Sequence, residues 1–245
     1  MHEDIAQGVV KNFENTFVYN SEAQLLQTFL DLIEDSDIIT GWNSEGYDLP
    51  YLVNRVIRVL SKDDTRRFCL WDQFPKKFSY EKYGGEQISF KLTGRVHLDY
   101  LELYRKYTYH EMHSYSLDTV AEYELQDKKI PYEGTLDQLY NTDFEKFIEY
   151  NRQDVMLIVR MDEKLRFIDL ANELAHQNTV LLPTTMGAVA VTEQAIINEA
   201  HAQGLVVPNK PDRDDSKTVT AAGAYVATPM KGLHHWIGSV DINSL

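Results

Sequence analysis

The fold is decided by residues 38–60, which read IITGWNSEGYDLPYLVNRVIRVL. Residues 38–42 form a short, mostly apolar run that predicts a β-strand, and the polar residues 43–46 predict a tight turn. Pro50 suits the first turn of a helix, and the apolar residues around it recur on one helical stripe. The segment therefore predicts a strand, turn and helix of an α/β fold. The turn lies at the carboxyl end of the strand, where open α/β sheets usually keep their functional groups.

The flanking sequence predicts further alternation of strands and helices. Residues 78–92 alternate polar and apolar side chains around a Gly-Gly pair, which predicts a β-hairpin, and residues 96–98 predict another short strand. Thr142 and Glu145 have the spacing of a capping box ahead of the clearest helical pattern in the chain. Pro183 predicts the start of a last helix, rich in small residues.

Composition limits the possible functions. The 245 residues are 43% hydrophobic, enough for a sizeable core, and carry a net charge of −14. This charge argues against a broad nucleic-acid surface, but a DNA enzyme can work through carboxylates and bound cations. The single cysteine, Cys69, predicts a reducing compartment. No membrane-spanning run or cationic apolar leader is visible, so we expect the cytoplasm, or that of an infected host cell.

Two carboxylates occupy positions that structure alone does not explain. Asp48 follows the turn at the start of the second helix, and Asp154 lies within the apolar stripe of the long helix, one turn after Tyr150. Asp48 could simply cap its helix, and Asp154 could pair with Arg152, Arg160 or a neighbouring element. Alternatively, both acids hold divalent cations, with Tyr150 aimed at the same place because positions four apart share a helix face.

The same segments carry a resemblance to a known family. Three segments resemble, in order, the second exonuclease motif, the third exonuclease motif and the first polymerase motif of family B DNA polymerases: GWNSEGYDLPY at 41–51, YNRQD at 150–154 and VDINSL at 240–245. Three smaller segments resemble the T-even-type bacteriophage branch of this family: LDYLELY at 98–104, YSLDTVA at 115–121 and AGAYV at 222–226. Ordered motifs at suitable spacing are far more specific than any one of them.

The resemblance implies a ribonuclease-H-like 3′–5′ proofreading exonuclease domain that leads into a polymerase palm. In the family, four carboxylates hold two divalent cations, Mg²⁺ or Mn²⁺, which activate water and stabilise the leaving oxygen. The implied partners are single-stranded and primer-template DNA, dNTPs at the palm and fingers, and the remainder of the polymerase.

Individual roles are implied residue by residue. Asp48 and Asp154 correspond to two of the four exonuclease ligands, and Tyr150 to the residue that positions the attacking water. Asp241 corresponds to a catalytic palm aspartate that binds metal. The DNA-binding positions implied by the resemblance are Asn43, Tyr47, Gly223 and Ala224.

The chain also departs from the family pattern. No Asp-x-Glu motif precedes Asp48, so two ligands and the strand that bears them are not visible, and Ala221 stands where an aromatic is usual. We therefore expect an N-terminally incomplete α/β exonuclease domain over residues 1–176, a helical connector with a polar loop over 177–217, and the beginning of a palm over 218–245. The chain would be a fragment, a truncation or half of a split polymerase.

Three functional hypotheses remain open at this point. The first is the exonuclease region of a phage replicative polymerase, with little or no nuclease activity in isolation because half of the ligand set is missing. The second is a non-catalytic DNA-binding or scaffold subunit of a split polymerase. The third is a stand-alone exonuclease, against which the palm-like residues around Asp241 argue.

Overall fold

The computed structural model describes residues 8–82, 84–209, 223 and 227–238. The chain divides into two compact units, Met1–Val206 and Val207–Leu245. In the described ranges, every helix is too short or too polar to cross a bilayer.

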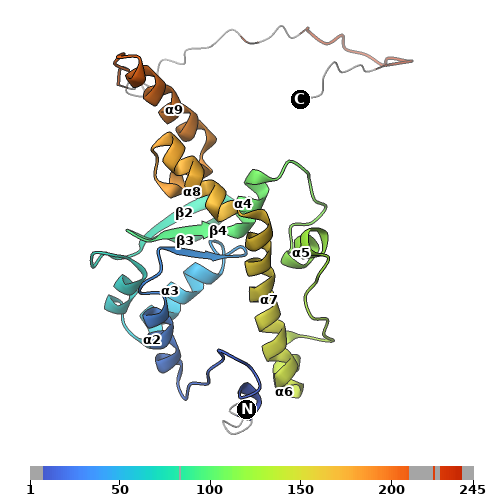
Figure 1. Cartoon of the computed structure of the whole chain (residues 1–245). Helices are drawn as coiled ribbons and strands as arrows, with labels where there is room; N and C mark the ends of the chain where they lie inside the picture. Colours follow the sequence, from blue (N-terminus) through green and yellow to red (C-terminus); the bar gives the residue numbers. More distant parts are fainter. Residues whose placement is uncertain (1–7, 83, 210–222, 224–226, 239–245) are drawn as a thin grey trace. The chain divides into compact units, whose positions relative to one another are not determined.

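A parallel strand pair organises the first unit (Figure 1). Strand β1 (Ile38–Gly41) pairs with β4 (Val96–Asp99), and the register places Ile38 beside Val96 and Gly41 beside Asp99. Parallel pairing brings the carboxyl ends of both strands to one edge. The predicted strands at 38–42 and 96–98 are thus confirmed within a residue at their ends.

Helices cover both faces of this pair because neighbouring side chains along a strand point to opposite faces. Ile39 packs with the buried residues of α2 (Glu22–Leu32) and α3 (Asp48–Val59). Ile38 packs instead with the second core cluster, which α4 (Tyr100–Tyr107), α5 (Leu117–Leu125), α7 (Phe144–Leu165) and α8 (Phe167–Asn178) supply. The predicted α/β arrangement is therefore present in the described part of the chain.

The long helix α7 begins differently from the prediction. Its N-cap is Asp143, whose carboxylate accepts the backbone N–H of Lys146 at 3.0 Å. Thr142 instead ends α6 (Leu136–Thr142) and donates its hydroxyl to Gln138 O at 2.8 Å. The capping box predicted for Thr142 and Glu145 is wrong, because a closer acid takes the capping position.

The last helix also starts later than predicted. Pro183 lies in the 3-10 turn η2 (Leu182–Met186), and α9 (Ala188–Ala202) begins after Gly187. Proline suits the start of either kind of helix, so the sequence did not distinguish them.

The predicted hairpin is present. Strands β2 (Lys76–Lys82) and β3 (Gly85–Lys91) pair antiparallel, with Lys82 opposite Gly85. Gly84 has a φ of 74°, a left-handed conformation that glycine adopts without a steric penalty.

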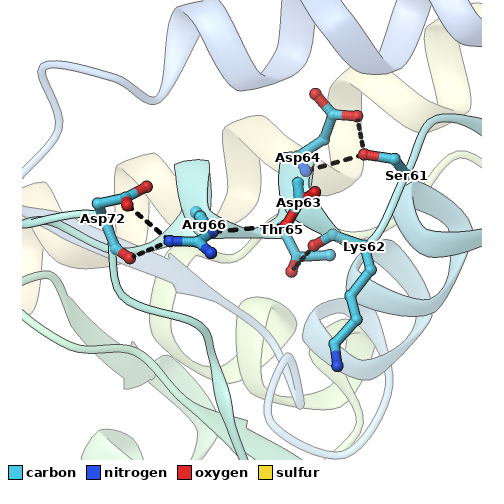
Figure 2. Close-up of polar contacts among 7 residues, drawn as sticks. All are labelled: Ser61, Lys62, Asp63, Asp64, Thr65, Arg66 and Asp72. Atoms are coloured by element: carbon cyan, nitrogen blue, oxygen red, sulfur yellow. Dashed lines mark hydrogen bonds and ion pairs between the residues drawn. The ribbon is translucent and has the colours of Figure 1, made fainter.

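The polar residues around η1 (Asp63–Phe68) pair with one another (Figure 2). Ser61 donates its hydroxyl to Asp64 at 2.6 Å, and Arg66 donates to the Asp72 carboxylate at 2.6 Å. The Arg66 guanidinium also lies over the Phe74 ring, 4.1 Å from its centroid. The charge of Arg66 is therefore paired within this cluster.

Candidate functional site

A cavity of about 1060 Å³ opens at the carboxyl edge of β1 and β4. Its walls include residues of α2, β1 and the following turn, α3, η1, β4, α4, α5, the segment between α5 and α6, and α7. The residues that line it include Asn43, Asp48, Lys129, Asn151 and Asp154. The structure therefore brings the two predicted acidic residues, from positions far apart in the sequence, to one cavity.

Asp48 is the first residue of α3. By surface area it is exposed, yet the concave wall excludes enough water to raise the pKa of its carboxyl, and its own backbone N–H opposes this only in part. In the part of the chain described, no cationic side chain pairs with Asp48. The simple capping interpretation also fails, since the N-cap is Tyr47 and no side chain caps the helix.

Asp154 is held by a partner from another element. Its Oδ2 accepts a hydrogen bond from Lys129 Nζ at 2.6 Å, and the two side chains are 25% and 27% exposed. The expected ion pair with a neighbouring element therefore exists, but with Lys129 and not with Arg152 or Arg160. Asp154 Oδ1 is buried and has no hydrogen-bond partner among the described residues.

Tyr150 reaches the site through the same lysine. Lys129 Nζ donates to the Tyr150 hydroxyl at 3.2 Å and lies 5.3 Å from the centroid of its ring. The contacts with Asp154 and Tyr150 outweigh the burial of the ammonium and raise the pKa of Lys129. One cation thus contacts both the phenol and the carboxylate, which lie on one face of α7 as their spacing predicted, although Tyr150 is not among the residues that line the cavity.

Asn43 and Tyr47 lie in the turn between β1 and α3. Asn43 lines the cavity and has a φ of 57°, a left-handed conformation that asparagine tolerates better than most residues. Tyr47 is 65% exposed and stacks on Tyr51, with ring centroids 6.0 Å apart and planes at 6°. An exposed aromatic pair beside a carboxylate could stack on an unpaired base.

Two residues of β4 support this turn. The Asp99 carboxylate accepts backbone N–H groups of Asn43 and Glu45 at 2.9 and 3.1 Å. Burial raises the pKa of Asp99, and these hydrogen bonds oppose the shift. His97 lies 2.9 Å from the Ser44 hydroxyl through Nε2, and burial lowers the pKa of His97 to about 4, so its ring is neutral at pH 7.

The donor set fits a divalent cation. Carboxylate oxygens are the ligands that Mg²⁺ and Mn²⁺ prefer. Asp154 Oδ1 is an orphaned acceptor, and Asp48 lines the same cavity without a cationic partner in the described ranges. Around the cavity, no cluster of three or more acidic, histidine or cysteine side chains forms among the described residues. The fit therefore rests on two carboxylates.

Sequence reasoning missed three residues of this site. Lys129 follows another lysine in a loop, and nothing in its local pattern separates it from a surface charge. Asp99 is the N-cap of α4 and accepts the Leu101 N–H at 3.0 Å. Asp99 lies at the carboxyl end of a predicted strand, where open α/β sheets usually keep their functional groups, and this position could have indicated a further role. His97, two positions earlier on the same strand, could have been found in the same way.

The remaining predicted positions lie elsewhere. Gly223 is exposed and belongs to the second unit. Ala224 and Asp241 lie outside the described residues.

Two acids that line one cavity at the carboxyl edge of parallel strands, with the Tyr150 phenol linked to one of them through Lys129, define a class: an α/β unit with a carboxylate-lined cavity. Residues 2–120 match the model of the family described as DNA polymerase family B, exonuclease domain. These residues are therefore similar to the exonuclease domain of family B DNA polymerases.

Curated relatives agree with this assignment. A DNA-directed DNA polymerase of Enterobacteria phage T4 is 30% identical over 93% of this chain and 25% of its own length. The corresponding protein of Escherichia phage RB69 is 28% identical with the same coverage. A DNA polymerase of Methanocaldococcus jannaschii is 25% identical over 94% of the chain and 14% of its own length. The chain spans about a quarter of the two phage relatives.

Proposed function

We propose that this chain is the 3′–5′ proofreading exonuclease part of a DNA-directed DNA polymerase, and that it acts on the unpaired 3′ end of a primer. The observation that carries the proposal is the shared cavity of Asp48 and Asp154, with the free Oδ1 of Asp154 inside the protein. The family whose model matches residues 2–120, the exonuclease domain of family B DNA polymerases, supports the same activity.

Asp48 and Asp154 would hold the divalent cations. When bound, such cations lower the pKa of a water and stabilise the charge on the leaving oxygen of a phosphodiester. Lys129 fixes Asp154 Oδ2 and donates to the Tyr150 hydroxyl, which leaves the phenol proton available to a water or a phosphate oxygen. Asn43 offers an amide to the DNA backbone, and Tyr47 offers a ring to a base.

The finer assignments belong to the same proposal. The chain would derive from a T-even-type phage polymerase acting in the host cytoplasm. Residues 1–176 would form the exonuclease domain, 177–217 a connector, and 218–245 the start of a palm with Asp241 as a catalytic metal ligand. Gly223 and Ala224 would contact DNA, and dNTPs would bind with the remainder of the polymerase.

The isolated chain should hydrolyse DNA slowly or not at all, because the described cavity presents two carboxylates where the resemblance implies four. Cation binding is therefore the sharper test. We expect Mn²⁺ to bind the purified chain, measured by electron paramagnetic resonance, and to bind Asp48→Asn and Asp154→Asn at least about tenfold more weakly.

The matched control is Asp137→Asn, an exposed first-turn acid of α6 that should leave Mn²⁺ affinity unchanged. Equal affinity in all four proteins would refute the proposed site. Rapid Mg²⁺-dependent degradation of single-stranded DNA, abolished by Asp154→Ala, would overturn the expected inactivity but support the site.

One observation favours a second candidate function. The ammonium of Lys129 already neutralises one of the two acids, as expected for a site that binds DNA without hydrolysing it. In that case Mn²⁺ would not bind, while Asn43→Ala would still weaken binding of single-stranded DNA.

A further inference from the structure

We propose that His97 and Asp99 of β4 are positioning residues, which hold the turn after β1 in the conformation that presents Asn43 and Asp48 to the cavity. This inference deepens the proposed function and rests on it for the identity of the ligand. The geometry of the turn can be tested separately.

Asp99 does more than cap α4. One oxygen, Oδ1, accepts N–H groups from both Asn43 and Leu101, at 2.9 and 3.0 Å, and Oδ2 accepts the Glu45 N–H at 3.1 Å. A cap of α4 requires only the Leu101 contact. The other two hydrogen bonds join β4 to a turn more than fifty residues earlier in the chain. Asp99 is 6% exposed, so water cannot easily replace them.

The turn needs such support because its backbone is tight. Asn43 has a positive φ, which disfavours most side chains. Its amide group folds over Gly46, where an added Cβ would lie 3.0 Å from Asn43 Oδ1. At Gly41 an added Cβ would lie 2.9 Å from Ser44 Cβ. Two charge-assisted hydrogen bonds to the turn therefore stabilise a conformation that is otherwise unfavourable.

His97 supports the other side of the turn. Asp99 and His97 are two positions apart on β4 and so face the same way. The Ser44 hydroxyl donates to Gly41 O at 3.2 Å, which leaves it to accept the Nε2 proton of His97 at 2.9 Å. Ser44 is 4% exposed, and its carbonyl accepts the Leu49 N–H at 2.9 Å, which sets the first turn of α3. Through Ser44, His97 helps to fix where Asp48 begins that helix.

The test compares Asp99→Asn with the wild-type chain. The amide keeps one acceptor oxygen but presents an NH₂ group where Oδ2 accepted an N–H, so it cannot satisfy the whole turn. Amide hydrogen exchange at Asn43 and Glu45 should accelerate at least about tenfold. Mn²⁺ affinity should fall several-fold, with a changed resonance spectrum, although Asp99 does not line the cavity.

Two further variants separate positioning from general destabilisation. Asp143→Ala removes the N-cap of α7 and should leave exchange at Asn43 and Glu45 unchanged. Ser44→Ala removes the His97 contact and should reproduce the faster exchange of the turn. Asp99→Glu should restore Mn²⁺ affinity in part, because it keeps two acceptor oxygens.

Faster exchange confined to residues 100–104 in Asp99→Asn would show a simple helix cap and overturn the proposal. Faster exchange in the turn with unchanged Mn²⁺ affinity would also overturn it, because the turn would not position the site. If the wild-type chain binds no Mn²⁺, the proposed function fails, while the exchange measurement still decides whether Asp99 and His97 hold the turn.

Discussion

Asp48 and Asp154 share a cavity but are held in different ways. Asp48 is exposed, starts a helix and has no cationic partner among the described residues, and its surroundings raise its pKa. Asp154 is mostly buried within a helix and pairs with Lys129. One acid therefore has no cationic partner among the described residues, whereas the ammonium of Lys129 neutralises the other. The difference shows how two acids can share a cavity when an internal cation compensates only one of them.

The largest loss of stability should come from lowering the pH, and it should act through His97, which supports the turn before Asp48. His97 is neutral when folded, with its pKa lowered to about 4 by burial. The unfolded chain binds this proton first, so the free energy of unfolding should fall as pH drops from about 6.5 to 4, by up to about 3 kcal/mol. Urea denaturation across this range would measure the loss.

The variant His97→Gln should remove this part of the pH dependence, and His176→Gln, an exposed histidine of α8, should retain it. If wild type and His97→Gln lose stability in parallel, the acid sensitivity comes from another group.

A smaller effect should follow from removing the internal cation. Lys129→Met leaves the Asp154 carboxylate mostly buried and uncompensated, so the free energy of unfolding should fall by about 2 kcal/mol. The double variant Lys129→Met, Asp154→Asn should recover most of this loss, as measured by urea denaturation. Equal losses in the single and double variants would mean that Lys129 acts by packing alone.

The smallest effect is expected at Asp48 itself. Asp48→Asn removes a carboxylate with a raised pKa but also a favourable charge at a helix N-terminus, and the two changes oppose each other. Thermal unfolding without metal should therefore place its stability within about 0.5 kcal/mol of wild type. A loss as large as that of Lys129→Met would remove the contrast between the two acids.

The sequence by itself determined the elements and the two acids. Apolar runs and spacing located β1, β4, the hairpin and α7, because these patterns reflect local periods of burial. The spacing of Tyr150 and Asp154 placed both on one face of α7 for the same local reason. The start of α7 was misplaced, since Thr142 and Asp143 compete for one cap and local pattern does not rank them.

Only the tertiary structure decided how the acids are supported. Lys129 reaches Asp154 from a separate segment, and Asp99 reaches the turn from another strand, so neither contact leaves a periodic trace in the sequence. Such contacts depend on the parallel pairing of β1 with β4 and on the packing of helices over both faces. Hydrogen bonds and ion pairs act over a few ångströms in space, whatever the separation along the chain.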